Sequence, residues 1–261
     1  MFSDKVTKVA IPVAGKGTRM RPLTKAVPKE LIALGKKPVL EHILDECIES
    51  GLTDVLLITA EGKDAIRNHF GDEYNGAKIS YTFQKEQSGL ANAIYCAKDF
   101  AEGQPFAVAL GDCFVESDGD RAFKRMIDEY AAYPADCMLM VEEKPREELG
   151  RFGVVKPKDG LGDPFEVDGL VEKPNPAEAP SPYIISGRYI FAPTIFDYIE
   201  KTPRGAGGEY QIADSMSLMM ADGGRVWCTP LGDGDILKDV GTFESYFEAF
   251  AAEIEKYRNA K

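Results

Sequence analysis

The stretch KVAIPVAGKGTRM, residues 8–20, decides the fold. Its first part, Lys8–Val13, is an apolar run of the length of a buried strand, and a glycine turn at residues 15–17 follows at once. Pro12 has no amide hydrogen to give to a neighbouring strand, so we place it near the strand's end. Glycines let backbone N–H groups approach an anion, and Arg19 adds a forked phosphate donor. The stretch predicts a strand that leads into an anion-binding turn.

Two well-known phosphate-binding motifs do not fit this turn. It lacks the G-x-x-x-x-G-K-[ST] spacing of a P-loop. It also lacks the third glycine of a dinucleotide fingerprint, because Met20 stands there. A nicotinamide dehydrogenase is therefore disfavoured, and the turn alone leaves the ligand open.

Strands and helices alternate through the first half of the chain. Apolar runs predict strands at Asp54–Thr59, Lys78–Phe83, Phe106–Leu110 and Ala135–Glu142, and helical spacing predicts helices at Val39–Ser50, Lys63–Phe70, from a Ser88 cap to about Phe100, and Asp120–Ala132. Crossovers of about a dozen residues or more suit parallel strands. The pattern predicts an α/β fold, a Rossmann-like doubly wound mixed sheet.

The second half is less regular. Residues 151–172 are rich in glycine and proline and contain short strand-like pieces. Further strands are expected at Tyr183–Phe191 and Arg225–Pro230. Helices are expected at Pro193–Glu200, Ile212–Ala221 and Thr242–Tyr257. No linker or repeat separates the halves. We therefore expect one domain, residues 1–261, with an inserted substrate lobe. The apolar positions of the last helix could pack on the core or on another subunit, so a homo-oligomer is possible.

The charge of the chain is uneven. Its 261 residues carry 43 acidic and 31 basic side chains, a net charge of −12. Residues 5–37 nevertheless hold nine basic residues and one acid, Glu30. An acidic protein is a poor ligand for nucleic acid or for an anionic membrane. The basic stretch suits small anions instead, with Arg19 and Lys29 as the chemical candidates, Lys16, Arg21 and Lys25 as supporting charge, and Lys5, Lys8, Lys36 and Lys37 as surface residues.

Targeting and cysteine patterns indicate a cytoplasmic protein. No run of 18 apolar residues predicts a membrane span, and the N-terminus does not resemble a signal peptide. The five cysteines are scattered and form no C-x-x-C pair, which argues against zinc or redox sites. The two histidines, His42 and His69, are expected to be structural.

Acidic residues follow two predicted strand ends, where ligands bind in open α/β sheets. Asp112 follows the strand that ends at Leu110, and a carboxylate there suits Mg²⁺, which takes one or two carboxylates plus phosphate oxygens. Asp239 could give a second carboxylate. Each residue also has a purely structural interpretation, Asp112 as a turn residue and the 238–242 segment as the cap of the last helix through Thr242.

Taken together, the motifs resemble the sugar-1-phosphate nucleotidylyltransferases. The resemblance runs through residues 14–30, Gln84, 88–91, 110–112, 152–155, 171–174 and 238–241. Residues 24–30, 187–189 and 202–211 are most similar to the bacterial UTP–glucose-1-phosphate uridylyltransferase branch. Gly111 stands where that branch usually has proline and the thymidylyl branch has glycine, and the middle of the chain is short, so the choice of base stays open.

The resemblance implies a reaction and a set of site residues. A uridylyl group would pass from UTP to glucose 1-phosphate, giving UDP-glucose and pyrophosphate, with Mg²⁺ as cofactor. The roles it implies are phosphate binding by Ala14, Gly15, Gly17 and Thr18, pyrophosphate binding by Arg19, charge stabilisation by Lys29, base recognition by Gln84 and Gly89, metal binding by Asp112 and Asp239, and sugar-phosphate binding by Gly153, Glu172, Lys173 and Gly187. Residues 1–142 would then form the nucleotide-binding half, 143–241 the sugar-binding lobe and 242–261 a closing helix.

Three alternatives remain open at this point. One is a thymidylyltransferase that makes dTDP-glucose. Another is a sugar-nucleotide glycosyltransferase, whose Asp-x-Asp metal motif is matched by Asp118–Asp120 and Asp233–Asp235 in turn-like segments. The last is a non-catalytic sugar-nucleotide-binding subunit.

Overall fold

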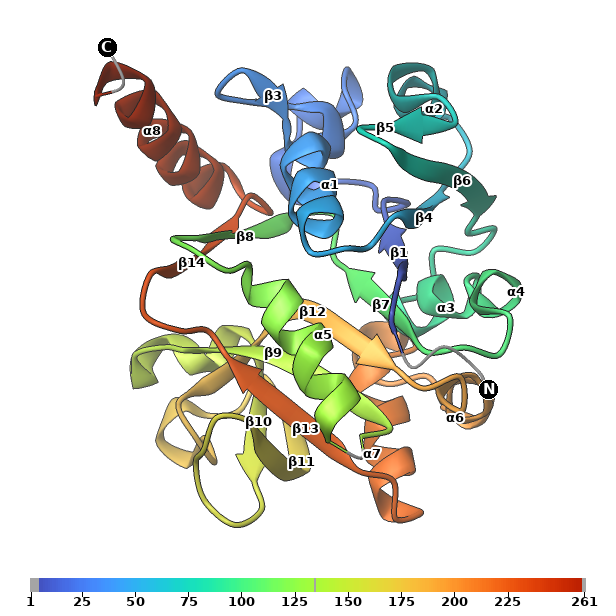
Figure 1. The fold of residues 1–261 in the computed structure, drawn as a ribbon, viewed down its shortest axis with the longest axis vertical. Helices are drawn as coiled ribbons and strands as arrows, with labels where there is room; N and C mark the ends of the chain where they lie inside the picture. Colours follow the sequence, from blue (N-terminus) through green and yellow to red (C-terminus); the bar gives the residue numbers. More distant parts are fainter. Residues whose placement is uncertain (1–4, 134, 260–261) are drawn as a thin grey trace.

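The computed structural model describes residues 5–133 and 135–259. A ten-stranded mixed sheet has the order β10-β11-β13-β9-β12-β7-β1-β4-β6-β5 (Figure 1). Its strands are β1 (Lys8–Pro12), β4 (Asp54–Thr59), β5 (Glu73–Tyr74), β6 (Ala77–Phe83), β7 (Phe106–Ala109), β9 (Cys137–Glu143), β10 (Gly153–Pro157), β11 (Phe165–Glu172), β12 (Tyr183–Phe191) and β13 (Val226–Pro230). Two small sheets pair β2 (Ala33–Leu34) with β3 (Lys37–Pro38), and β8 (Cys113–Ser117) with β14 (Asp235–Asp239). The mixed α/β fold class is confirmed.

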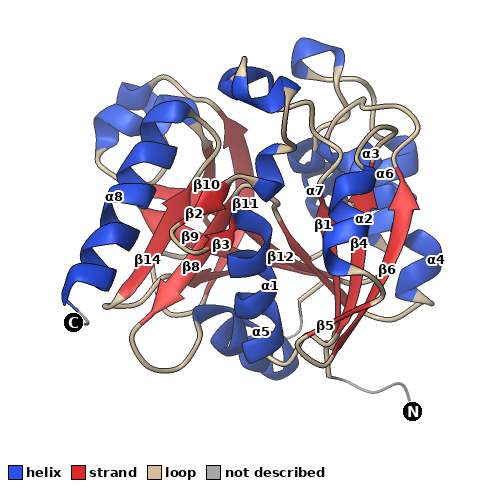
Figure 2. Cartoon of the chain, turned by 90° about the horizontal axis from the view of Figure 1, so that it is seen from above, coloured by secondary structure: helices blue, strands red, loops and turns tan. Residues whose placement is uncertain are grey.

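The helices cover both faces of the large sheet, as Figure 2 shows. They are α1 (Val39–Glu49), α2 (Asp64–Phe70), α3 (Leu90–Tyr95), α4 (Lys98–Ala101), α5 (Ala122–Ala132), α6 (Ile195–Lys201), α7 (Ile212–Ala221) and α8 (Phe243–Asn259). Side chains of α1, α2 and α5 share one buried apolar cluster with the sheet, and those of α3, α6 and α7 share another. No described helix is long and apolar enough to cross a membrane.

The centre of the sheet is parallel, as the sequence predicts. β1 pairs in parallel with β4, from Lys8 opposite Asp54 to Pro12 opposite Ile58, and with β7 on its other side. Pro12 is the last residue of β1, so its missing N–H costs no ladder hydrogen bond inside the strand. The carboxyl ends of β1, β6 and β7 consequently meet at one edge.

The first-half strand β9 does not lie next to β7. β12 lies between them and is antiparallel to both. The partner strand comes from the second half of the chain, and local sequence patterns do not encode such a distant pairing. The two halves therefore share one continuous sheet.

Two local predictions also need correction. Gly89 rather than Ser88 occupies the N-cap position of α3, and the expected helix to Phe100 divides into α3 and α4. Lys8, expected at the surface, is nearly buried, and its Nζ donates to Phe100 O at 2.7 Å. The last helix fits its predicted cap, because Ser245 N–H donates to Thr242 Oγ1 at 3.2 Å.

Candidate active site

A cavity of about 590 Å³ opens at the carboxyl ends of β1, β6 and β7. Eight predicted site residues line it: Ala14, Gly15, Thr18, Arg19, Lys29, Gln84, Gly89 and Asp112. Gln87 and Glu209 also line it, although the sequence analysis did not single them out. The cavity gathers residues from four segments that are far apart in the chain, at the edge where α/β sheets bind their ligands.

The glycine turn after β1 is tightly constrained. Gly17 has a φ of 61°, and a Cβ there would lie 2.9 Å from Thr24 Cγ2. Thr24 Oγ1 donates to Gly17 O at 2.7 Å, and Gln87 Nε2 donates to Ala14 O at 2.6 Å. Gly17 itself does not line the cavity, so it acts here through the shape of the turn.

A buried ion pair supports the start of this turn. Lys63 Nζ lies 2.9 and 2.8 Å from the two carboxylate oxygens of Glu30 and donates to Val13 O at 2.5 Å. The Glu30 side chain is fully buried. Burial raises the pKa of Glu30, although Lys63 and Lys29 oppose that change. The pair joins the end of β1 to the segment that carries Lys29. Its only signal in the sequence was that Glu30 is the one acid in the basic stretch of residues 5–37.

Opposite charges meet at the floor of the cavity. Lys29 Nζ donates to Asp112 Oδ2 at 2.7 Å, and Arg19 Nη2 lies 3.7 Å from the same oxygen. Burial favours a higher pKa for Asp112, but Lys29, Arg19 and Arg188 together lower its pKa below the usual value. Burial would lower the pKa of Lys29, and Asp112 and Glu30 outweigh it and raise the pKa. Both groups are therefore charged at neutral pH.

Asp239 lies close to Asp112 because β14 pairs with β8 in a ribbon that is separate from the large sheet. Asp239 is opposite Cys113 in the β8/β14 ribbon, and Val240 N–H donates to Asp112 O at 2.9 Å. Asp239 Oδ1 accepts from Gly241 N–H at 2.6 Å. Burial raises the pKa of Asp239, and the nearby Asp112 carboxylate raises it further. The ribbon thus places a second acidic group near the first.

Gln84 and Gly89 are adjacent at the end of β6. Gln84 Nε2 donates to Asn92 Oδ1 at 2.9 Å and to Gly89 O at 3.2 Å. Gly89 has a φ of 118°, and a Cβ there would lie 2.4 Å from Tyr210 O. The part of the cavity wall formed by Gly89 therefore depends on close backbone contact with Tyr210, in the segment before α7.

The predicted sugar-phosphate residues do not line this cavity. Gly153 and Glu172 are opposite each other in the β10/β11 pair, and Lys173 Nζ lies 3.3 Å from Glu172 Oε1. A Cβ at Gly187 would lie 3.2 Å from Leu110, which does line the cavity. Burial, then Cys113 and Cys137, and then the carboxylates of Glu172 and Asp112 raise the pKa of Tyr189. The negative charges of the Glu172 and Asp112 carboxylates therefore both act on the Tyr189 phenol.

The Asp-x-Asp segments lie at the opposite end of the ribbon from Asp112 and Asp239. Asp118 N–H donates to Gly234 O at 3.2 Å where β8 ends and β14 begins. Asp235 Oδ2 instead accepts from Arg125 Nη2 at 2.6 Å and from Gly232 N–H at 2.8 Å. A five-residue strand separates the two ends by about 15 Å, so these aspartates do not join the cavity.

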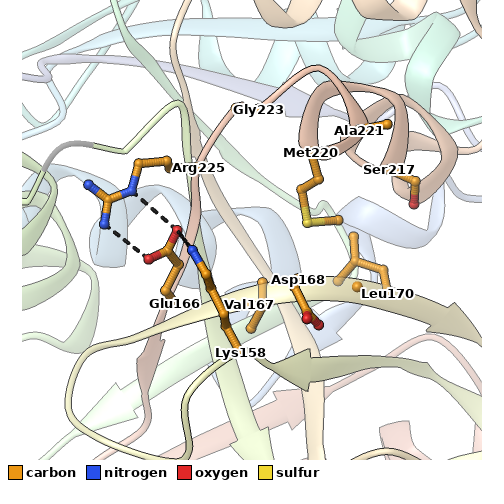
Figure 3. Close-up of a pocket in the computed structure, with 12 residues that line it drawn as sticks. Lys158, Glu166, Val167, Asp168, Leu170, Ser217, Met220, Ala221, Gly223 and Arg225 are labelled. Carbon is orange, nitrogen blue, oxygen red and sulfur yellow. Dashed lines mark hydrogen bonds and ion pairs between the residues drawn. The ribbon is translucent and has the colours of Figure 1, made fainter.

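A second cavity of about 530 Å³ lies between β11 and α7. Figure 3 shows Glu166 between Arg225 and Lys158, with Met220 and Leu170 on the other side. The Arg225 and Lys158 nitrogens lie 3.0 and 3.2 Å from the Glu166 carboxylate, so both of these cations already have an acidic partner. None of the predicted site residues lines it.

The remaining nucleophiles and bases have structural contacts. His42 Nε2 lies 2.9 Å from Leu34 O, and His69 Nε2 lies 2.8 Å from Glu41 Oε1. Cys113 is buried against Ser186 O, and burial raises its pKa to about 12. All five cysteines are free. No serine, histidine or cysteine nucleophile is therefore prepared in the described cavity.

The fold and the site define an α/β protein with a cavity at its strand ends that is lined by Arg19, Lys29 and Asp112. A family model for nucleotidyl transferases matches residues 8–256. The chain belongs to this family and is a nucleotidyltransferase.

Relatives and solved structures agree with that assignment. The UTP–glucose-1-phosphate uridylyltransferase of Bacillus subtilis is 37% identical over 237 residues, covering 82% of this chain and 80% of the relative. The Staphylococcus epidermidis enzyme of the same name is 39% identical and covers 82% of each chain. A UDP-glucose pyrophosphorylase in complex with UDP-glucose has a TM-score of 0.89 at 30% identity, covering 96% of this chain and 99% of the other.

Proposed function

We propose that this protein transfers a uridylyl group from UTP to glucose 1-phosphate and releases pyrophosphate. The observation that carries the proposal is the joining of Arg19, Lys29 and Asp112 at one cavity floor, with Lys29 Nζ 2.7 Å from Asp112. Uridylyltransferases more than 35% identical over 82% of this chain support the choice of substrates.

The chain's own residues supply positioning and charge neutralisation. The attacking phosphate oxygen of the sugar is already ionised, so the reaction needs no protein nucleophile or general base. Backbone groups of Ala14, Gly15 and Thr18 hold the triphosphate, and Gly17 shapes the turn that carries them. Arg19 takes the pyrophosphate side, and Lys29 neutralises charge at the α-phosphate. For Lys29 to do this, its ammonium exchanges Asp112 for a phosphate oxygen when the nucleotide binds. Gln84 and Gly89 face the base.

The acidic pair fits a divalent cation, which we propose to be Mg²⁺. The described residues hold no cluster of three or more metal-ligating side chains, but Mg²⁺ commonly uses one or two carboxylates plus substrate phosphates. Asp112 raises the pKa of Asp239 through repulsion between the two carboxylates, a repulsion that a cation relieves. Asp112 and Asp239 would hold the ion, which when bound would neutralise charge on the phosphates.

The sugar phosphate would bind at the ends of β10, β11 and β12. Glu172 would accept hydrogen bonds from sugar hydroxyls, and Lys173, whose side chain is 64% exposed, would leave Glu172 to pair with the phosphate. Gly153 and Gly187 would leave room for the sugar. In this proposal residues 1–142 form the nucleotide-binding half, residues 143–241 form the sugar-binding lobe, and residues 242–261 form a closing helix.

A panel of nucleotides tests the proposal. Pyrophosphate release would be measured with UTP, dTTP, CTP, ATP and GTP, each with glucose 1-phosphate, galactose 1-phosphate or no acceptor, and Mg²⁺. We expect the highest kcat/KM with UTP and glucose 1-phosphate and no release without acceptor. Equal or better turnover with dTTP would instead establish the thymidylyltransferase, and no turnover with any nucleotide would leave a binding subunit.

A further inference from the structure

Glu46 and Arg188 form a buried ion pair behind the candidate metal site. Arg188 Nε donates to Glu46 Oε1 at 2.9 Å, and Nη2 donates to Oε2 at 2.6 Å. The Arg188 side chain is 0% exposed and that of Glu46 is 3% exposed. The two residues come from β12 and α1, which are separated by 142 positions. Both charges are fully withdrawn from water, and such a pair is expensive to bury and weak evidence for stability by itself.

The ion pair completes the hydrogen bonding of β8. Arg188 Nη2 donates to Cys113 O at 2.8 Å, and Val115 N–H donates to Glu46 Oε2 at 2.9 Å. β8 belongs to the two-stranded ribbon with β14 and not to the ten-stranded sheet. Its other edge therefore needs partners for buried backbone groups. A side-chain donor and a side-chain acceptor provide them, in the place of a neighbouring strand.

These contacts fix the positions of both acidic residues. Cys113, which Arg188 holds, directly follows Asp112 and is opposite Asp239 in the ribbon. The same guanidinium donates through Nη1 to Gly187 O at 3.1 Å, and Gly187 O also accepts from Leu110 N–H at 3.0 Å. Arg188 therefore contacts the segment next to Asp112 on the side away from the cavity. Lys29 contacts the Asp112 carboxylate on the cavity side.

We propose that Glu46 and Arg188 are positioning residues that set the geometry of Asp112 and Asp239 and thereby the affinity of the site for a divalent cation. This inference rests on the proposed function, because it needs those carboxylates to share a cation with the nucleotide. Arg188 and Glu46 are 0% and 3% exposed, so neither side chain is accessible to the substrates. Their effect passes through the backbone of β8.

The test compares R188K and E46Q with the parent protein. R188K keeps the positive charge but loses the planar guanidinium that donates to both Glu46 oxygens. E46Q keeps the shape of the side chain but loses its negative charge. Calorimetry without sugar phosphate gives the UTP affinity in Mn²⁺ and in EDTA, and the ratio reports the contribution of the metal. We expect that ratio to fall about tenfold or more in both variants, as for other residues that orient metal ligands. The affinity in EDTA should stay within about twofold of the parent.

R125M provides a matched control. Arg125 pairs with Asp235 at the far end of the same ribbon, and the Asp235 side chain is 4% exposed. R125M should lower the melting temperature and leave the Mn²⁺ ratio unchanged. The double variant E46M/R188M removes both charges but leaves Cys113 O and Val115 N–H without their partners. It should therefore melt below the parent, and it should not recover the Mn²⁺ ratio.

An unchanged Mn²⁺ ratio in folded R188K and E46Q would overturn the positioning role, and so would an equal loss in R125M. Recovery of the ratio in the double variant would also overturn it. The proposed function fails differently, through absence of uridylyl transfer by the parent. In that case the ratio is measured with the nucleotide that the parent does use, or with UDP-glucose if it uses none.

Discussion

Lys29 Nζ donates a 2.7 Å hydrogen bond to Asp112 Oδ2 and so joins the segments that follow β1 and β7. The Lys29 side chain is only 16% exposed and that of Asp112 is 24% exposed, so the contact is partly shielded from water. Without a ligand each charge satisfies the other. In the proposed function, a triphosphate in the cavity would offer Lys29 stronger acceptors and would free Asp112 for a cation.

Lys29→Met should therefore lower kcat strongly while the protein stays folded. The loss of charge stabilisation at a reacting phosphate is expected to lower kcat by about 10²-fold or more. Initial rates of pyrophosphate release, with thermal melting as a folding check, measure both effects. Lys98→Met is the matched control, because Lys98 pairs with Glu200 on exposed α4 and α6. A kcat for Lys29→Met within threefold of the control would contradict the assigned role.

Much of this site could be predicted because it depends on local patterns. The strand–turn boundary at Pro12, the apolar run before Asp112 and the cap at Thr242 are each visible within a few residues. The rule that parallel strands present their carboxyl ends at one edge then brings Gly15 and Asp112 together. Lys29 was expected there only from the resemblance to the family. In the structure all three residues line one cavity.

The rest depends on contacts between distant segments. β12 enters the sheet between β7 and β9, and β14 pairs with β8 across more than one hundred residues. Neither pairing has a local signal, because a strand's sequence records its burial and not its partner. Arg188 was visible only as part of a family pattern, and its burial against Glu46 required the structure. The nearly complete burial of Lys8 was missed for the same reason.

Gly89→Ala should weaken nucleotide binding and stability together. The added Cβ would lie 2.4 Å from Tyr210 O on a backbone with φ of 118°, so the segments before α3 and α7 must separate. We expect a loss of about 2–4 kcal/mol in the free energy of unfolding and at least tenfold weaker UTP binding by calorimetry. Gly103→Ala is the control, because Gly103 has φ of 72° and nothing within 4 Å of its Cβ position. It should cost only about 1–2 kcal/mol, the cost of an L residue at positive φ, and leave UTP binding intact.

Lys63→Met should destabilise the protein strongly. Lys63 is the ion-pair partner of the fully buried Glu30 carboxylate, and removal of one member of such a pair typically costs about 3–5 kcal/mol. Urea unfolding at pH 7 measures this loss. The double variant Glu30→Met/Lys63→Met should recover most of the stability, since no buried charge then lacks its partner. A double variant as unstable as Lys63→Met would show that packing, and not the unpaired charge, causes the loss.

The Asp235–Arg125 ion pair should make stability depend on pH in a specific window. Burial favours a higher pKa for Asp235, but hydrogen bonds from Arg125, Ser117 and Gly232 lower it below its usual value. A carboxyl group whose pKa is lower in the folded state stabilises the fold above its unfolded pKa, near 3.9, and loses this effect as the pH falls through the folded pKa. Asp235→Asn should therefore cost about 1–2 kcal/mol at pH 7.

That cost should be unchanged at pH 5.5 and should shrink steadily below about pH 4, because Asp235 of the unfolded parent then takes up a proton and Asp235 of the folded parent follows at lower pH. Urea unfolding of both proteins at pH 7, 5.5, 4 and 3 measures the difference directly. Lys124 and Asp128 form an exposed ion pair four residues apart on α5, so Asp128→Asn is the control and should cost less than about 0.5 kcal/mol at every pH. A cost for Asp235→Asn that stays constant from pH 7 to 3 would mean that the side chain acts through its shape and hydrogen bonds and not through its charge.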